Sequence, residues 1–429
     1  MSAAVEQLRS EFDTVRAQLP GSVIAPERRS QAIAALCAQG LPSAREENWR
    51  YTNLRILERA RFAPVDAHAE ATLAQLPETP AGFARWVFVD GLLRSGTAAE
   101  DPGFSVRSRR SLPAALAPAW PLGSDLPEAR LALLNEAFAL DALAIDVHGP
   151  AAPAGIELVF VTASTAQAGT SYPRVHLRLA AGVELTVIER HLGAPQTGSL
   201  VNGAMHVELG EHARLQHYRL QQSAAQTTWF DTLAAELSAH AHYRLLSIGT
   251  GAQSARSTVH VRLAGAGAHL ELSAAALADR QQSQDMYVLS EHLAPDTRTT
   301  ETFRGIASGR GRVAFNGKIV VHPQARGSDS RQSLRGLLDG PEAEIDVRPQ
   351  LEIYTDEVRC SHGATAGKLD ENMLFYLLAR GIGAPLAQQL LKWAFLEDVV
   401  AQIARTELRG EVERALSAQM NAAAMQELC

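Results

Sequence analysis

The sequence predicts a mixed fold, in which a right-handed parallel β-helix (a β-solenoid) forms the core and helical segments flank it at both ends. Alternating apolar and polar runs fill the middle of the chain, and small-residue corners that look alike separate them. Helical periodicity occupies the two ends. We therefore expect an N-terminal helical or mixed domain at 1–150, a β-helix at 151–355 and a C-terminal helical domain at 356–429.

The N-terminal domain begins with two expected helices. Apolar residues recur at helical spacing over residues 5–19, and the dipeptide at 20–21 is Pro-Gly, which ends the run. Residues 26–39 start on a proline, which suits the first position of a helix. Residues 63–121 have a mixed α/β pattern, and residues 126–143 indicate a further helix.

The pattern changes to strands from about residue 156. Alternating runs typical of strands with one buried face occur at 176–179, 184–187, 206–209 and 269–272. Similar corners recur every 27 to 30 residues, at 181–183, 211–213, 239–241 and 266–268. Later corners at 309–311, 323–325 and 341–343 come at roughly half that spacing. A regular period of strand and corner, with no helix between strands, is typical of a stacked β-solenoid.

A β-sandwich is the alternative for this region. Its turns would be more irregular and richer in hairpin dipeptides such as Asn-Gly. Only Asn202-Gly203 and Asn316-Gly317 fit that signal. We therefore favour the β-helix.

The C-terminal domain returns to helical patterns. Asp370 is a good N-cap for a helix that would end at Gly381. A second helix is expected to begin near Pro385, and its apolar stripe continues to Ile403.

Composition and charge exclude several classes of protein. The net charge of −7 and the lack of a dense basic face argue against a nucleic-acid partner. No apolar run approaches the ~18–20 residues that span a bilayer, and the N-terminus has no apolar signal-peptide core. The three cysteines, Cys37, Cys360 and Cys429, are too few for a disulfide framework. We expect a soluble, cytoplasmic protein.

Nucleotide-binding and hydrolase motifs are missing from the sequence. Residues 311–318 have the wrong spacing for a phosphate loop, and Ile319 stands where a Ser or Thr must hold magnesium. Residues 249–251 lack the third glycine of a dinucleotide fingerprint. No His-Glu-x-x-His or Gly-x-Ser-x-Gly pattern occurs. We expect no intrinsic ATP site.

The candidate metal ligands are Cys360 and His362. Two residues apart in an extended segment, they would share one face of a strand. A thiolate and an imidazole are ligands that iron and iron–sulfur clusters accept, but two ligands make half a site. A buried small cysteine beside a hydrogen-bonded histidine is the structural alternative. His240 and His242 also lie two apart, and for them we favour a polar strand face in solvent.

The residues around this pair resemble the SufB/SufD family of iron–sulfur cluster assembly scaffold subunits. The matching segments, densest over 300–405, are 45–54, 315–319, 332–338, 349–354, 358–365, Gly367, Asp370, 374–377, 380–382 and 394–395. SufB-like chains carry a cysteine within the segment that matches 332–338, and this chain has none. They also have an acidic residue where this chain has Ser361. Both departures favour the SufD side of the family.

The resemblance implies a non-catalytic scaffold subunit of the Suf complex. It implies pairing with a SufB-like subunit through the β-helix, and binding of a SufC-like ATPase through the helices from Asp370 to Ile403. The cargo would be iron or a nascent Fe–S cluster shared with the partner. His362 matches the histidine implicated at the family's subunit interface and is the stronger ligand candidate. Cys360 is the weaker one.

Two other interpretations remain open. A β-helix carbohydrate-active enzyme, such as a polysaccharide lyase, would call for a secretion signal and a cluster of carboxylates that binds Ca²⁺. Neither is visible in the sequence, so we regard this alternative as weak. Open edge strands would also allow the isolated chain to form a homodimer.

Overall fold

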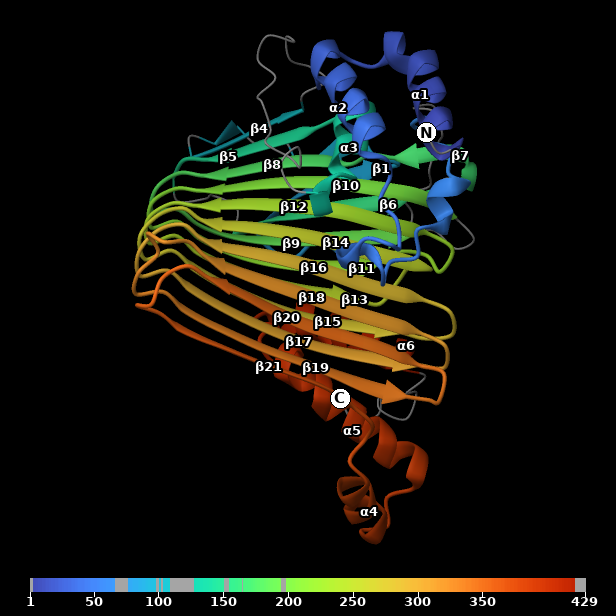
Figure 1. Ribbon diagram of the computed structural model, residues 1–429, viewed down its shortest axis with the longest axis vertical. Coiled ribbons are helices and arrows are strands. Elements are labelled where there is room, and N and C mark those ends of the chain that lie inside the picture. Colours follow the sequence, from blue (N-terminus) through green and yellow to red (C-terminus); the bar gives the residue numbers. More distant parts are fainter. Residues whose placement is uncertain are drawn as a thin grey trace.

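The computed structural model describes residues 3–65, 76–97, 100–101, 103–108, 127–149, 154–163, 165–193 and 198–420, and every structural statement below refers to them. Figure 1 shows an elongated stack of strands, with the N-terminal helices at one end and the helices of residues 371–400 at the other. The expected mixed α/β region at 63–121 lies partly outside the described residues.

Two sheets form the body of the molecule. In spatial order, sheet 1 contains β2 (Leu92–Gly96), β1 (Phe83–Val89), β6 (Gly155–Thr162), β9 (Glu184–Gly193), β11 (Arg214–Gln222), β13 (His242–Gly249), β15 (His269–Ala278), β17 (Arg298–Ser308), β19 (Asp329–Asp339) and β21 (Arg359–Gly367). Sheet 2 contains β20 (Glu344–Ile353), β18 (Arg312–Val321), β16 (Ser283–His292), β14 (Ser254–Leu263), β12 (Thr228–Leu237), β10 (Gly198–Leu209), β8 (Arg174–Leu179), β5 (Leu143–Val147), β4 (Phe104–Ser108) and β3 (Glu100–Asp101), with β7 (Thr165–Ser171) beside β10.

From β8 onward, consecutive strands alternate between the two sheets, and each strand pairs in parallel with the strand one coil away. Arg214 lies opposite both Glu184 and His242, so these coils are 30 and 28 residues long. This spacing matches the corner period in the sequence. The β-solenoid predicted from that period is confirmed, and so are the helical segments that flank it in the sequence. The Asn-Gly dipeptides at 202–203 and 316–317 lie inside β10 and β18 and form no hairpin turns.

The corners at half spacing have a simple explanation. Each coil turns twice, once from sheet 2 to sheet 1 and once from sheet 1 to sheet 2. The corners at 181–183, 211–213, 239–241 and 266–268 all belong to the first kind. Those at 309–311 and 341–343 belong to the second kind, and 323–325 belongs to the first. The sequence pattern thus identified one kind of corner along the middle of the chain and both kinds near its end.

Residues with left-handed backbone conformation occur at the corners from sheet 2 to sheet 1, and hydrogen bonds join these corners from coil to coil. His212, His240 and Asp296 have φ of 59°, 56° and 58°, a conformation that non-glycine residues seldom adopt. Their amide N–H groups donate to carbonyl oxygens of the next coil, to Ala239 at 2.9 Å for His212 and to Ala266 at 2.9 Å for His240. The left-handed conformation is therefore compensated by a ladder of hydrogen bonds along the solenoid.

The main hydrophobic core lies between the two sheets. Leu215 and Leu270 contribute from sheet 1, and Val207 and Val261 contribute from sheet 2. Helices also cover part of each outer face, so many strands are buried on both sides. In such strands both sets of alternate residues can be apolar, which weakens the alternation that sequence analysis relies on.

The N-terminal helices cover one end of the outer face of sheet 2. They are α1 (Ala3–Val15), the 3-10 turn η1 (Arg16–Gln18), α2 (Pro26–Gln39) and, after the 3-10 turn η6 (Pro127–Ala129), α3 (Ala132–Phe138). Arg29 of α2 joins them, because its buried guanidinium donates to four backbone carbonyls at 2.8 to 3.0 Å. Two of these acceptors, Ala137 and Ala139, lie in and just after α3.

The helix expected over 126–143 is shorter than predicted. Its helical part, α3, ends at Phe138, and the strand β5 already begins at Leu143. The extended backbone from Leu143 onward is set by tertiary contacts, because β5 pairs with β8 on one side and with β4 on the other. Pairing partners distant in the sequence overrode the local helical pattern.

A segment with two 3-10 turns, η2 (Glu47–Trp49) and η3 (Arg55–Glu58), lies across the outer face of sheet 2. The Trp49 ring is buried, with the Arg256 guanidinium 3.9 Å from its centroid. Arg256 also bonds Asp285 at 2.6 Å and Thr52 at 3.1 Å, and Thr52 donates to Asp285. This aromatic segment therefore anchors the N-terminal region to the solenoid.

The C-terminal helices are α4 (Glu371–Ala379), α5 (Ala384–Val400) and α6 (Thr406–Gln419). Asp370 caps α4, because one of its carboxylate oxygens accepts from the backbone N–H groups of Asn372 and Met373. The C-terminal half of α5 and α6 pack against the outer face of sheet 1. By contrast, α4 has no buried residue and projects away from the strands (Figure 1).

The sheets extend on both sides of the range 151–355 expected for the β-helix. Strands β1 to β5 come before it, and β21 comes after it. The division into three domains stays a prediction. Within the described segments, none of the helices combines the length and the apolar character that crossing a bilayer requires.

Candidate functional site at the open end of the solenoid

The two predicted ligands lie on β21, the last strand of sheet 1. Cys360 is opposite Ser330 of β19, and His362 is opposite Gln332. Gln332 points between the sheets, since it donates to the Gly317 carbonyl of sheet 2 at 3.0 Å. Paired residues of parallel strands share a face, so Cys360 and His362 also face the inner side of the solenoid. The structure thus brings both candidates together at the open end.

The two side chains differ in their surroundings. The Cys360 thiol is free of any disulfide and half-buried, and it packs beside an apolar cluster that includes Ile319 and Val321. His362 is exposed. The groups of three possible metal ligands found among the described residues lie elsewhere. Cys360 and His362 therefore form at most half of a metal site within this chain, and their ligand role stays a prediction.

An ionisable carboxyl lies one coil behind Gln332. Glu301 is fully buried, and it accepts hydrogen bonds from Gln332 Nε2 at 2.8 Å and from the Ser290 hydroxyl at 2.8 Å. Burial raises the pKa of this carboxyl to about 7, although both hydrogen bonds act in the opposite direction. In register, Glu301, Gln332 and His362 form one inward-facing column of sheet 1. A group that titrates near neutral pH therefore lies two coils from the exposed imidazole.

A second polar chain lies near Cys360. His292 is fully buried, and its Nδ1 lies 2.8 Å from the Thr297 hydroxyl, which is itself 2.8 Å from the Ser328 hydroxyl. Burial lowers the pKa of His292 to about 4, so its imidazole is neutral at physiological pH. The interior behind the open end therefore contains two buried titratable side chains, Glu301 and His292.

A buried charged cluster, which the sequence analysis missed, lies deeper between the sheets. Arg219 bonds Glu189 at 2.9 Å and also pairs with Asp231, while His191 and His217 bond the same Glu189 carboxylate. Burial alone would raise the pKa of Glu189. The Arg219 charge and the two histidine hydrogen bonds outweigh burial and hold it well below its ordinary range. Sequence analysis missed this cluster because the pairing of Glu189 with Arg219 depends on the register between neighbouring coils.

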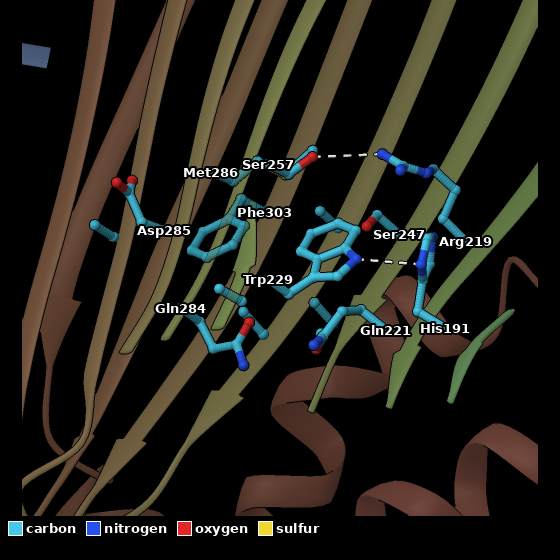
Figure 2. Close-up of a pocket in the computed structure, with 16 residues that line it drawn as sticks. His191, Arg219, Gln221, Trp229, Ser247, Ser257, Gln284, Asp285, Met286 and Phe303 are labelled. Atoms are coloured by element: carbon cyan, nitrogen blue, oxygen red, sulfur yellow. Dashed lines mark hydrogen bonds between the residues drawn. The ribbon is translucent and has the colours of Figure 1, made fainter. Parts of the chain in front are cut away.

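Figure 2 shows the cavity of about 40 Å³ next to this cluster. Trp229 of sheet 2 donates to His191 Nδ1 at 3.1 Å, and Arg219 donates to the Ser257 hydroxyl at 3.4 Å. Both contacts cross from one sheet to the other. Because the charges are paired within the cluster, we assign it a structural role in joining the sheets.

The end of the solenoid is not closed by another strand. Among the described strands, β20 and β21 each have a pairing partner on one side only. Ile353 and Tyr354, at the end of β20, are 41% and 60% exposed. An unpaired strand edge with exposed apolar side chains is a surface on which further strands can pair.

The helix α4 presents a second apolar surface. Four of its large apolar side chains are exposed: Met373, Phe375, Tyr376 and Leu378. On a free helix such side chains would remain in water, whereas a partner would bury them. The predicted docking range from Asp370 to Ile403 contains this surface and also the part of α5 that is buried against sheet 1.

The fold and its open end define the chain as a β-solenoid protein with unpaired terminal strands and a projecting helix that exposes apolar side chains. The family model described as "SUF system FeS cluster assembly, SufBD core domain" matches residues 160–395, and the chain belongs to this family. The resemblance predicted from the sequence motifs is confirmed.

Known relatives cover nearly the whole chain. It is 30% identical over 395 residues to the iron–sulfur cluster assembly protein SufD of Escherichia coli (strain K12), covering 89% of this chain and 90% of that protein. It is 25% identical over 424 residues to the chloroplastic protein ABCI7 of Arabidopsis thaliana, with 95% and 89% covered. A SufBD family protein of Synechocystis is 26% identical, with 91% and 90% covered. Family membership places the chain in a Suf-type system of iron–sulfur cluster assembly.

Proposed function

We propose that this chain is a non-catalytic scaffold subunit of a Suf-type iron–sulfur cluster assembly complex. It pairs with a SufB-like subunit at the open end of its solenoid and carries a SufC-like ATPase on α4 and the start of α5. His362, with Cys360 as the weaker second ligand, contributes to binding iron or a nascent cluster at the shared interface. Iron and sulfide are the cargo of this site, and ATP is the substrate of the partner.

The observation that carries the proposal is the position of the two candidate ligands. They lie on the inner face of β21, the last strand of sheet 1 in the chain, next to Gln332 and beside an unpaired edge. A partner that extends the sheets would bring its own residues within one strand spacing, about 4.8 Å, of this face. Half a site in each subunit would then make one complete site.

The exposed surface of α4 supports the second partner. Phe375 is 72% exposed and Tyr376 is 54% exposed, on a helix whose cap and end are well defined by Asp370 and Gly381. An ordered helix with aromatic side chains in water is typical of the element that enters a groove of another protein.

Co-expression with SufB-like and SufC-like subunits, followed by anaerobic purification, tests the proposal. We expect His362→Ala to leave the three-subunit complex intact and to lower bound iron and sulfide several-fold, with a smaller loss for Cys360→Ala. His212→Asn is the matched control, because His212 is an exposed histidine at a distant corner and asparagine tolerates its left-handed backbone.

Three outcomes would contradict parts of the proposal. Unchanged iron and sulfide in the His362→Ala complex would remove the ligand role. Loss of the complex in that variant would make His362 a structural residue. Purification of the wild-type chain as a homodimer that excludes the SufB-like subunit would overturn the partner assignment.

A further inference from the structure

We propose a second metal site, distinct from the open end, in which His176, His206 and Glu208 bind a divalent first-row transition-metal ion. The three residues lie on β8 and β10, on the outer face of sheet 2. Their neighbours in sequence, Val207 and Leu209, point into the core between the sheets. The site is far along the solenoid from Cys360 and His362, and it does not depend on the proposed function.

The strand register places the three ligand atoms together. His206 lies directly opposite His176 in the parallel pair, and their rings stack with centroids 5.2 Å apart and planes at 21°. Glu208 follows two residues after His206 and so shares its face. The Glu208 Oε1 atom lies 3.1 Å from His176 Nε2 and 3.5 Å from His206 Nδ1.

These separations fit a metal ion. With metal–ligand bonds of about 2.0–2.1 Å in tetrahedral geometry, neighbouring ligand atoms lie about 3.3 Å apart. The two measured separations, 3.1 and 3.5 Å, lie on either side of that value. The three candidate ligand atoms all lie within 4.8 Å of one another, so an adjustment of the side chains would bring them around a common ion.

An unpartnered nitrogen points to the same conclusion. The side chain of His206 is only 7% exposed, and its buried Nδ1 makes no hydrogen bond. Buried polar atoms normally have a partner, and an ion between Nδ1 and Glu208 would supply one. Imidazole nitrogens and carboxylate oxygens bind such an ion in their deprotonated forms.

The surrounding charges leave the site available. Arg178 Nε lies 3.8 Å from Glu208 Oε2, the oxygen that faces away from the histidines. Arg174, the other cation near His206, forms a buried ion pair with Glu136 of α3 at 2.6 Å. The Glu208 side chain is 42% exposed, so water can reach the remaining coordination positions.

The ligand set selects a class of metal. Two imidazoles and one carboxylate with open positions bind Zn²⁺ in hydrolases and Fe²⁺ in non-haem iron sites. Mg²⁺ and Ca²⁺ prefer oxygen ligands throughout. We therefore expect Zn²⁺ and Fe²⁺ to bind and Mg²⁺ not to compete.

A similar group on sheet 1 provides a matched control. His242 and His269 stack with centroids 4.5 Å apart beside Glu271. Here Arg244 Nε bonds Glu271 directly at 2.8 Å, and all three possible ligands are about a quarter to a third exposed. An arginine that already holds the carboxylate competes with an ion, so this group should bind a metal less well.

The experiment uses the full chain with Cys360→Ala and His362→Ala already introduced, which removes the candidate site at the open end. After treatment with a chelator, equilibrium dialysis against Zn²⁺, and against Fe²⁺ without oxygen, should give one bound ion per chain. Co²⁺ should give the visible absorption of a site with nitrogen ligands. Glu208→Gln should weaken binding about 10-fold or more, because a ligand is lost. Glu271→Gln should leave it unchanged.

Two results would overturn the proposal: binding by the Glu208→Gln chain that equals the parent, or loss of the ion in the Glu271→Gln chain. Circular dichroism of the metal-free proteins checks that the variants fold, and His176→Gln provides a second test of the same site. The parent chain already lacks the two candidate ligands at the open end. A negative result at His176, His206 and Glu208 would therefore not bear on the proposed assembly function.

Discussion

Replacing Glu301 with glutamine should remove a pH-dependent loss of stability. The wild-type carboxyl is fully buried, and its pKa is raised from 4.5 to about 7. Between these two values the folded protein keeps the proton and the unfolded chain releases it, so stability falls as pH rises. The loss is absent below the unfolded pKa and complete above the folded pKa.

The magnitude follows from the difference between the two pKa values. At 1.36 kcal/mol per pKa unit, the complete loss is about 3 kcal/mol, and about 2–3 kcal/mol of it falls between pH 5 and pH 8. Glutamine can keep both hydrogen bonds, because its oxygen can accept from Gln332 and its amide can donate to the Ser290 hydroxyl. The substitution therefore removes the titration and preserves the contacts.

Urea unfolding at pH 5 and pH 8, for the wild type and for Glu301→Gln, measures this difference. The wild type should lose about 2–3 kcal/mol more than the variant between the two pH values, and the other titrating groups cancel in the comparison. Glu184→Gln, at an exposed carboxylate, should behave as the wild type. A pH dependence identical in the wild type and Glu301→Gln would refute the argument that Glu301 is protonated in the fold.

Two further substitutions test other parts of the structure. Arg29→Met should lower the free energy of unfolding, measured with a chemical denaturant, by about 3 kcal/mol or more, because buried carbonyls lose the hydrogen bonds that the guanidinium donates. Arg16→Met, at an exposed arginine, should lower it by less than about 1 kcal/mol. Phe375→Glu should weaken binding of a SufC-like ATPase about 10-fold or more without changing the unfolding midpoint, and Glu371→Gln on the same helix should bind normally. Equal binding by both α4 variants would place the ATPase elsewhere.

Sequence analysis identified the solenoid because its corners repeat. Small residues recur at the coil spacing, and the strand register in the structure has the same spacing. Local signals at helix ends were also reliable: Pro26 starts α2, and Asp370 caps α4. The helix predicted over 126–143 was too long: α3 ends at Phe138, and β5 begins at Leu143 by pairing with distant strands, which local periodicity does not record.

The candidate site was predicted in part. The spacing of Cys360 and His362 indicated a shared face, and the register of β21 confirms that they share one. Glu301, two coils behind His362, was not found, because its neighbours in space are 11 and 31 residues away in sequence. The pair at His240 and His242 also separates in the structure: His240 stacks on His212 at a corner, and His242 stacks on His269.

The sequence by itself determined the repeat, the helical ends, the family and the thiol–imidazole pair, because each of these depends on residue type and on short or regular spacing. Tertiary structure alone decided which residues of different coils meet. Coil lengths vary by a residue or more, so only the actual register shows that His176 faces His206 and that Glu189 faces Arg219. The tertiary structure also decided which outer strand residues are buried. The pattern of apolar and polar residues along a strand is similar whether its outer face is covered by a helix or open to water.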